Sequence, residues 1–148
     1  MIIIEAKEVD LPILIKLYEQ LVYPPKRFGA EDVQFCERIF SRTKDNRNYQ
    51  IYLAVVNGQV VGTFSLLIMD SVAYGNPSAI LDDMVVDENW RGKGIGKMMI
   101  AEVQQICREK GCRKLMLSSN INRQEAHHFY KALGFQVHGY SFYVDLEA

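Results

Sequence analysis

The chain has 148 residues, of which 49% are apolar, and its 17 basic and 18 acidic side chains leave a formal net charge of −1. This length suits one domain with a real core, and the apolar fraction excludes a disordered chain. Nucleic-acid-binding proteins usually carry a strong basic excess, so the charge balance disfavours a nucleic-acid partner.

The N-terminus and the cysteines indicate a cytoplasmic protein. The first apolar run is too short for a signal peptide or a membrane span, so we expect no membrane association. Cys36, Cys107 and Cys112 are an odd number without CxxC spacing, which indicates reduced thiols. No metal-ligand spacing is present. Since no repeat or linker divides the sequence, we expect a single domain over residues 1–148.

The first elements follow from helix and strand patterns. Residues 2–5 are an apolar run typical of a strand. From Asp10, a residue suited to an N-cap, apolar positions follow the spacing of an amphipathic helix, and Pro24 ends that pattern. A second helix is expected over residues 31–41.

The middle of the chain predicts a hairpin followed by a crossover. Residues 51–69 contain two β-rich runs around Asn57-Gly58, a pair that tolerates the positive φ angles of a type I′ turn. Another strand is expected at residues 79–86. The glycine-rich stretch 91–97 opens a helix, and residues 113–119 return as a strand, so a parallel strand–helix–strand unit is predicted.

The C-terminal part predicts one more helix and two strands. An apolar stripe runs along residues 126–133, and the runs 135–138 and 140–146 can close the sheet. We therefore expect an α/β domain with helices on both faces of a mixed, mostly antiparallel sheet of about six to seven strands.

The stretch WRGKGIGKMMI, residues 90–100, places glycines at every second position before an apolar helix. Gly92, Gly94 and Gly96 allow close approach of the backbone to a ligand, and the helix N-terminus adds partial positive charge. Basic side chains at Arg91, Lys93 and Lys97 reinforce that sign. The stretch indicates an anion-binding loop, and a pyrophosphate fits it physically.

Spacing excludes two other phosphate loops. A P-loop requires G-x-x-x-x-G-K-[ST], whereas Met98 follows Lys97 and offers no hydroxyl for magnesium. A dinucleotide fingerprint requires G-x-G-x-x-G, and here the last glycine comes one residue early. The remaining alternative is a glycine-rich connection whose basic side chains are simply solvated.

Two motifs together resemble a known family. Arg91 to Gly96 match the signature R/Q-x-x-G-x-G/A, and residues 126–135 contain F-Y-x-x-x-G-F. With the order of the predicted elements, they resemble the GNAT superfamily of acetyl-CoA-dependent N-acetyltransferases over essentially the whole chain. The resemblance implies acetyl-CoA as cosubstrate, and a fourth strand that carries a bulge and splays from the fifth.

The resemblance also indicates where acetyl-CoA would bind. The loop amides would hold the pyrophosphate, and the fourth strand would pair with pantetheine as if with an added strand. Many members have Asn three residues before the helix-starting Ala; here Arg123 holds that place and Asn122 precedes it, so either could contact the cofactor. The expected cofactor-binding residues are Met84, Val85, Val86, Arg91, Gly92, Lys93, Gly94, Ile95, Gly96, Lys97, and Asn122 or Arg123.

Amine acetylation requires a base, because an alkylamine with a pKa near ~10 is almost entirely protonated at neutral pH. Asp82 and Asp83 interrupt an apolar strand, where aspartate is unfavourable without a partner or function. In relatives acting on polyamines or amino sugars, an acidic pair at this place holds or deprotonates the amine. Alternation would send the two side chains to opposite faces unless a bulge intervenes, so which one acts stays open. The resemblance assigns Tyr130 as the acid that protonates the leaving thiolate.

The family layout places the acceptor between the first two helices and the loop before the fourth strand. This nominates an aromatic set suited to a small amine or a ring: Tyr18, Tyr23, Phe28 and Tyr74. The same residues could equally be packing groups. The terminal strands could also pair across a homodimer, although nothing in the sequence requires it.

The expected function is acetyl transfer from acetyl-CoA to a primary amine of a small molecule, such as a polyamine, amino sugar or amino acid, within a ternary complex. Two alternatives stay open: a protein or peptide N-acetyltransferase, and a non-catalytic CoA-binding sensor. A sensor would lack a plausible acid and base, which Tyr130, Asp82 and Asp83 supply.

Overall fold

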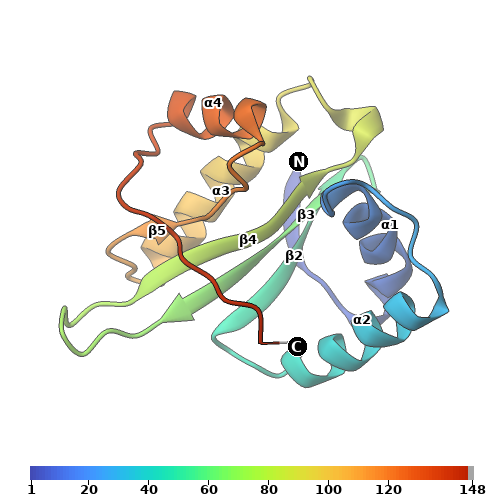
Figure 1. The fold of residues 1–148 in the computed structure, drawn as a ribbon, viewed down its shortest axis with the longest axis horizontal. Helices are drawn as coiled ribbons and strands as arrows, with labels where there is room; N and C mark the ends of the chain where they lie inside the picture. Colours follow the sequence, from blue (N-terminus) through green and yellow to red (C-terminus); the bar gives the residue numbers. More distant parts are fainter. Residues whose placement is uncertain (147–148) are drawn as a thin grey trace. The chain divides into compact units, whose positions relative to one another are not determined.

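Five strands form one sheet in the order β1–β2–β3–β4–β5 (Figure 1). The strands are β1 (Ile2–Glu5), β2 (Tyr49–Val56), β3 (Gln59–Met69), β4 (Ser78–Val86) and β5 (Leu115–Met116). The computed structural model describes residues 1–146. The pairs β1–β2, β2–β3 and β3–β4 are antiparallel, whereas β4–β5 is parallel. The parallel pair requires a crossover, which α3 (Ile95–Glu109) provides.

The chain divides into two compact units. The first, Met1–Met116, contains the whole sheet together with α3. Its other helices are η1 (Glu8–Asp10), α1 (Leu11–Leu21), α2 (Ala30–Thr43) and η2 (Glu88–Trp90). The second unit, from Leu117 onward, contains α4 (Gln124–Ala132).

Local sequence accounts for the first helix and the hairpin. α1 begins after Asp10 with a proline in its first turn and ends at Leu21. The turn between β2 and β3 places Asn57 at φ 49° and Gly58 at φ 79°, the left-handed conformations of a type I′ turn. Both predictions are confirmed.

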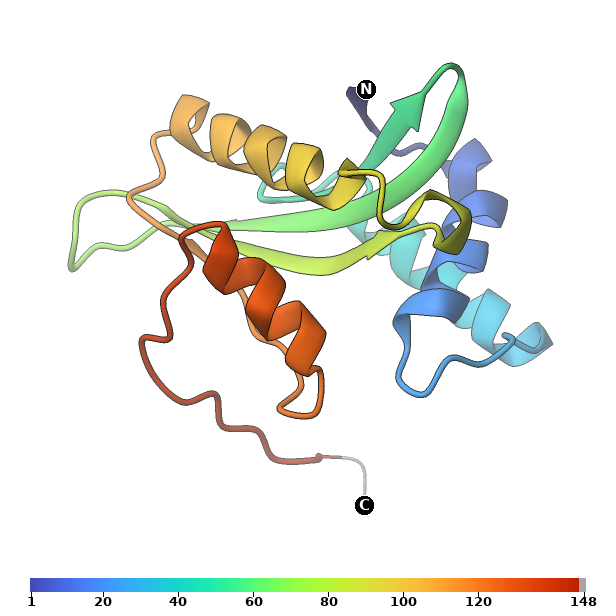
Figure 2. The same ribbon diagram turned by 90° about the horizontal axis from the view of Figure 1, so that it is seen from above.

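Helices pack on both faces of the sheet (Figure 2). On one face, Leu14 of α1 and Phe40 of α2 pack with Leu53 of β2. On the other, Met99 of α3 lies so close to β3 that a Cβ at Gly62 would come within 3.0 Å of its Sδ, and the same Cβ would lie 2.8 Å from Val85 O of the neighbouring β4. Full burial of one such large apolar side chain contributes about 1.5–3 kcal/mol.

The prediction of six to seven strands is not confirmed. The runs 135–138 and 140–146 form no strands in the described chain, and the strand expected at 113–119 is reduced to Leu115–Met116. The C-terminal apolar side chains are exposed, 91% for Tyr140 and 90% for Phe142. Alternation produces a strand only where a neighbouring edge and a core receive it, and the exposed side chains of this segment show that no core receives them.

None of the described helices combines the length and apolar character needed to cross a membrane.

Candidate active site

β4 contains a bulge in the middle of the strand. In its register with β3, Ser65 faces Asp82 and Thr63 faces Val85, so two steps along β3 correspond to three along β4. The extra residue lies between these pairs, where Asp83 adopts φ 47°. Left-handed backbone is uncommon for a residue with a side chain, although aspartate tolerates it better than most. The bulge expected from the family resemblance is therefore present.

The bulge changes how the two carboxylates are presented. Burial raises the pKa of the Tyr49 phenol in β2, and the charges of both Asp83 and Asp82 raise it further. Both carboxylates therefore influence the Tyr49 phenol. Strict strand alternation, which places neighbouring side chains on opposite faces of the sheet, would not bring both of them to the same phenol. The Asp83 backbone N–H donates to Asp82 Oδ1 at 2.9 Å, which ties the pair together.

Asp83 differs from Asp82 in its surroundings. Burial raises the pKa of Asp83 from 3.8 to about 6, and the neighbouring charge of Asp82 adds to the rise. The Asp82 side chain, in contrast, is exposed. A carboxylate with a pKa of about 6 is mostly ionised near neutral pH yet takes up a proton readily, as a general base must.

Asp82 and Asp83 belong to a polar cluster, which we define as Tyr18, Tyr49, Ser65, Asp82 and Asp83. Burial raises the pKa of the Tyr18 phenol in α1, and the charge of Asp83 is the next cause. Ser65 is fully buried, and its Oγ has no hydrogen-bond partner in the described chain. The Ser65 hydroxyl opposes the rise in the pKa of the Tyr49 phenol, although the two groups form no hydrogen bond of standard geometry.

The glycine loop ends in a row of free amides. Gly92 lies at φ 73° and Gly94, the N-cap residue of α3, at φ 79°. The first intrahelical bond runs from Met98 N to Gly94 O at 3.1 Å, and no backbone or side-chain acceptor within residues 1–146 takes the N–H groups of residues 92–97. Around both positive-φ glycines the space is open. Six successive free amides at a helix N-terminus fit a pyrophosphate.

The side chains beside this loop hold it to β4 and α1. Arg91 Nε donates to Val86 O at 3.0 Å. Gln20 Oε1 of α1 accepts from Glu88 N at 2.9 Å, and Gln20 Nε2 donates to Asp87 Oδ2 at 3.2 Å. Lys93 lies over the Trp90 ring, with Nζ 4.8 Å from its centroid. Gln20 was not identified from the sequence, because a glutamine on a helix carries no signal of this role.

β4 leaves most of its second edge unpaired by β5. Only Ala79 and Ile80 of β4 pair with β5, opposite Leu115 and Met116. The residues expected to contact pantetheine, Met84 to Val86, lie beyond this pairing. The Val86 carbonyl already accepts from Arg91 Nε, and Val85 is paired with Thr63 of β3.

Of the four aromatic residues expected to bind the acceptor, Tyr18 alone belongs to the polar cluster. Tyr23 is 66% exposed, and Tyr74 stacks with Arg113, whose guanidinium carbon lies 3.8 Å from the ring centroid. Phe28 lies in the α1–α2 connection.

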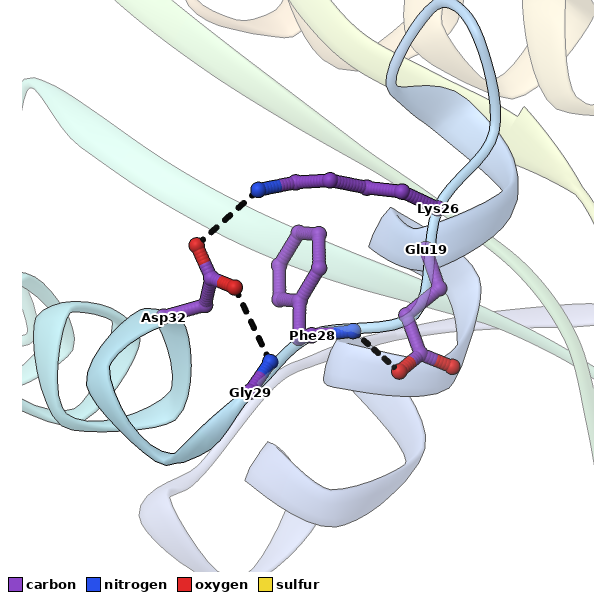
Figure 3. Close-up of polar contacts among 5 residues, drawn as sticks. All are labelled: Glu19, Lys26, Phe28, Gly29 and Asp32. Atoms are coloured by element: carbon purple, nitrogen blue, oxygen red, sulfur yellow. Dashed lines mark hydrogen bonds and ion pairs between the residues drawn. The ribbon is translucent and has the colours of Figure 1, made fainter.

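That connection is held by polar contacts (Figure 3). Phe28 N donates to Glu19 Oε1 at 2.7 Å, and the Lys26 Nζ lies 5.5 Å from the Phe28 ring centroid. Asp32 accepts from Gly29 N at 2.9 Å and pairs with Lys26 at 3.1 Å. These contacts order the start of α2 beside the C-terminal end of α1.

The second unit contains Tyr130 in an aromatic setting. Its ring meets Phe129 at 5.2 Å and Phe135 at 5.5 Å between centroids, both edge to face. Burial raises the pKa of the Tyr130 phenol, while the charge of Arg123 opposes the rise. The phenol therefore stays protonated at neutral pH, as a proton donor requires. Asn122 N donates to Asn120 Oδ1 at 2.9 Å.

Two further features lie outside this chemistry. A hollow of about 370 Å³ is lined by Ile13, Gln59, Val60, Asp87, Asn89 and Trp90 and contains neither the polar cluster nor the loop amides. The part of the chain that the structure covers holds no group of three or more side chains arranged to bind a metal ion.

Comparison with known proteins connects these features to a family. The profile of the Acetyltransferase (GNAT) family matches residues 14–135. The chain is 30% identical over 141 residues to glucosamine 6-phosphate N-acetyltransferase of Trypanosoma brucei brucei, covering 95% of this chain and 92% of that protein. It is 34% identical over 89 residues to aminoalkylphosphonate N-acetyltransferase of Salmonella typhimurium, covering 60% of this chain and 58% of that protein.

A solved structure extends this similarity to the fold. The crystal structure of a Trypanosoma brucei acetyltransferase superposes with a TM-score of 0.73 at 26% identity, covering 98% of this chain and 99% of that one.

Proposed function

Because the chain belongs to the Acetyltransferase (GNAT) family and is therefore an acyltransferase, we propose that it transfers an acetyl group from acetyl-CoA to a primary amine of a small molecule, by direct transfer in a ternary complex. The observation that carries the donor side is the row of free amides over residues 92–97. Two relatives named for small phosphorylated or phosphonate amines support a small acceptor.

The residues proposed for the donor site follow the loop and the strand. The amides of residues 92–97 hold the pyrophosphate with the Arg91 side chain beside them, and the backbone of Met84 to Val86 holds pantetheine along the free edge of β4. Asn122 or Arg123 adds a further contact. We propose that the whole chain acts as one N-acetyltransferase domain.

The chemistry needs a proton acceptor and a proton donor. Bound acetyl-CoA supplies the acetyl group through its thioester, whose C–S bond breaks as the C–N bond of the amide forms. Asp83 takes the first proton from the acceptor ammonium, directly or through water. Tyr130 gives a proton to the leaving thiolate, and the second proton that the acceptor nitrogen loses as the amide forms returns to the Tyr130 phenolate. Burial, together with a pKa of about 6, favours Asp83 over the exposed Asp82 as the base.

Binding of the donor is tested by thermal unfolding. With acetyl-CoA at a hundredfold excess over its dissociation constant, the free energy of unfolding should rise by ~2.7 kcal/mol. The shift is read by differential scanning fluorimetry with acetyl-CoA and with CoA. If neither ligand moves the unfolding midpoint, the donor assignment is wrong.

Catalysis is tested by thiol release. Polyamines, amino sugars, aminoglycosides, amino acids and peptides with free N-termini are each supplied with acetyl-CoA, and free CoA is followed with a thiol reagent. Turnover of small amines supports the proposal. Turnover of peptides alone would make the chain a peptide N-acetyltransferase, and donor binding without any turnover would make it a sensor.

A further inference from the structure

α3 ends in a glycine-dependent cap that brings two cysteines together. Gly111 follows the helix at φ 71°, and its N–H donates to Arg108 O at 3.0 Å. The N–H of Cys112 donates to Cys107 O at 2.9 Å. These two bonds define a Schellman motif, in which the residues joined by the longer bond commonly pack their side chains together. Here both of those residues are cysteines with free thiols.

The hydrogen bond between Cys112 and Cys107 limits how far apart the two residues lie. With N and O 2.9 Å apart, standard backbone dimensions hold the two Cα atoms to a separation of at most about 6.8 Å. Disulfides join Cα atoms that lie about 4.4–6.8 Å apart. The thiols also influence each other, since burial, and next to it Cys112, raises the pKa of Cys107 to about 11. The cap therefore holds the two cysteines within the range that a disulfide spans.

The segment that begins at Cys112 ties the end of α3 to the sheet. Arg113 N donates to Pro77 O at 2.8 Å, and Ala79 N donates to Lys114 O at 2.9 Å. These bonds join the approach to β5 to the start of β4. A covalent bond across the cap would therefore restrain both the last turn of α3 and the place where β4 and β5 begin to pair.

We infer that Cys107 and Cys112 form a redox-active pair, whose disulfide links the C-terminal end of α3 to the segment that leads into β5. The site is separate from the proposed acetyl transfer. A low-molecular-weight disulfide, such as oxidised glutathione, is the oxidant. Cys107 is 5% exposed and Cys112 is half-buried, so the Cys112 thiolate attacks first.

The exchange proceeds in two steps. Attack by Cys112 forms a mixed disulfide and releases one glutathione thiol. Cys107 then loses its proton to solvent and attacks the Cys112 sulfur, which releases the second glutathione thiol. Two protein thiols are oxidised to one disulfide, and one glutathione disulfide is reduced to two thiols.

The test uses the full chain with Cys36→Ser, which leaves only the pair. After equilibration with oxidised glutathione at mildly alkaline pH, the protein should lose two hydrogen atoms in mass and both free thiols. Non-reducing electrophoresis should show chains that are not linked to one another. Trypsin cuts after Arg108 and Lys110, so the peptides that contain Cys107 and Cys112 should stay joined until dithiothreitol is added.

The disulfide should also stabilise the cap. Because it closes a short loop of the unfolded chain, oxidation of Cys36→Ser should raise the thermal unfolding midpoint by about 4–8 °C. The amides of Arg113 and Ala79 should exchange with deuterated water more slowly in the oxidised form. The matched control combines Cys36→Ser with Cys112→Ser; it keeps the buried Cys107 and should show neither change.

Three chemical outcomes would overturn the inference: a persistent mixed disulfide with glutathione, chains linked to one another, or two thiols that stay free. A disulfide that forms but lowers the unfolding midpoint would overturn it as well, because the bridge would then strain the cap rather than restrain it. Peptide mapping of the parent chain checks that the pair also forms when Cys36 is present. None of these results depends on acetyl-CoA, so the proposed function stands or falls separately.

Discussion

Asp83 combines two features that each cost stability. Its backbone is left-handed at φ 47°, and its carboxylate is held in a partly buried site beside Asp82. Strained backbone and disfavoured charge persist where the surrounding structure imposes them, and such sites are often functional. Both costs therefore support the assignment of Asp83 as the base.

Asp83→Asn should remove activity and raise stability together. Asparagine keeps the shape of the side chain and tolerates left-handed backbone, but it cannot accept the proton, so turnover should fall by about 10²-fold or more. Loss of the disfavoured charge should raise the free energy of unfolding near pH 8 by on the order of 1–3 kcal/mol. Steady-state kinetics and urea unfolding measure the two effects.

The pH dependence follows from the direction of the shift. The folded state holds the Asp83 proton more tightly than the unfolded chain, since its pKa rises from 3.8 to about 6. This contribution to stability is present below the lower value and is lost as pH rises through the upper one. The gain in Asp83→Asn should therefore shrink toward pH 4. In the parent enzyme, kcat/KM should fall below about pH 6 as the base becomes protonated. A flat profile between about pH 5 and pH 8 would contradict Asp83 as the base.

The sequence identified the acidic pair but not which member is buried. Asp82 and Asp83 are identical in type, and an extra residue in a strand has no reliable sequence signal. Tyr49 and Ser65 were missed, because each occupies an ordinary alternating position of its strand. Their relation to Asp82 depends on strand register, which only the pairing of β2, β3 and β4 determines.

At the scale of elements, the role of the glycine loop in ligand binding can be tested separately from the backbone cost of replacing a glycine. Gly94 and Gly58 share φ 79°, and a Cβ at either would meet open space, so replacing either with alanine should cost a similar ~1–2 kcal/mol of backbone energy. The positions differ in function, because Gly94 begins α3 and Gly58 lies in the β2–β3 turn.

Gly94→Ala should therefore weaken acetyl-CoA binding, while Gly58→Ala should leave it unchanged at a comparable loss of stability. Isothermal titration calorimetry gives the affinities and urea unfolding gives the stabilities. Equal affinity in both variants would show that the amide row of α3 does not hold the donor.

Elements with strong local signals were predictable from the sequence. Asn57-Gly58 fixed the hairpin, and the prolines after Tyr23 ended α1 close to its observed end at Leu21. The second helix was expected over residues 31–41, and the observed α2 extends somewhat further, over Ala30–Thr43. The runs after Gly134 show the limit of periodicity, since alternation cannot reveal whether a neighbouring strand edge is available.

At the scale of the whole molecule, the net charge of −1 includes two regions of opposite charge, a basic loop and an acidic pair. Arg91, Lys93 and Lys97 surround the amides that precede and open α3, whereas Asp82 and Asp83 dominate the polar cluster on β4. The anionic donor and the cationic acceptor would each meet a complementary charge. Composition alone could not show this separation.

Raising the salt concentration should therefore weaken the binding of both substrates in parallel. Between about 0.1 M and about 1 M salt, the Debye length falls from about 10 Å to about 3 Å, so KM for acetyl-CoA and for a polyamine such as putrescine should both rise. KM for 4-aminobutan-1-ol, in which a hydroxyl replaces one ammonium of putrescine, should rise less, because it carries one charge fewer. A rise for one substrate alone would show that only one of the two sites works through its charge.

The bulge in β4 has a consequence for how this scaffold can change. Regular pairing with β3 holds on both sides of it, at Asp82 and before, and at Val85 and after. Residues 83 and 84 of β4 lie opposite a single residue of β3, so one extra residue is accommodated while the register on both sides is kept. Substitutions beside the bulge that leave Asp83 in place would change the acceptor side of the proposed site, while the glycine loop, anchored separately through Gln20 and Arg91, keeps its shape. Acceptor preference could therefore diversify around the bulge while the glycine loop stays constant.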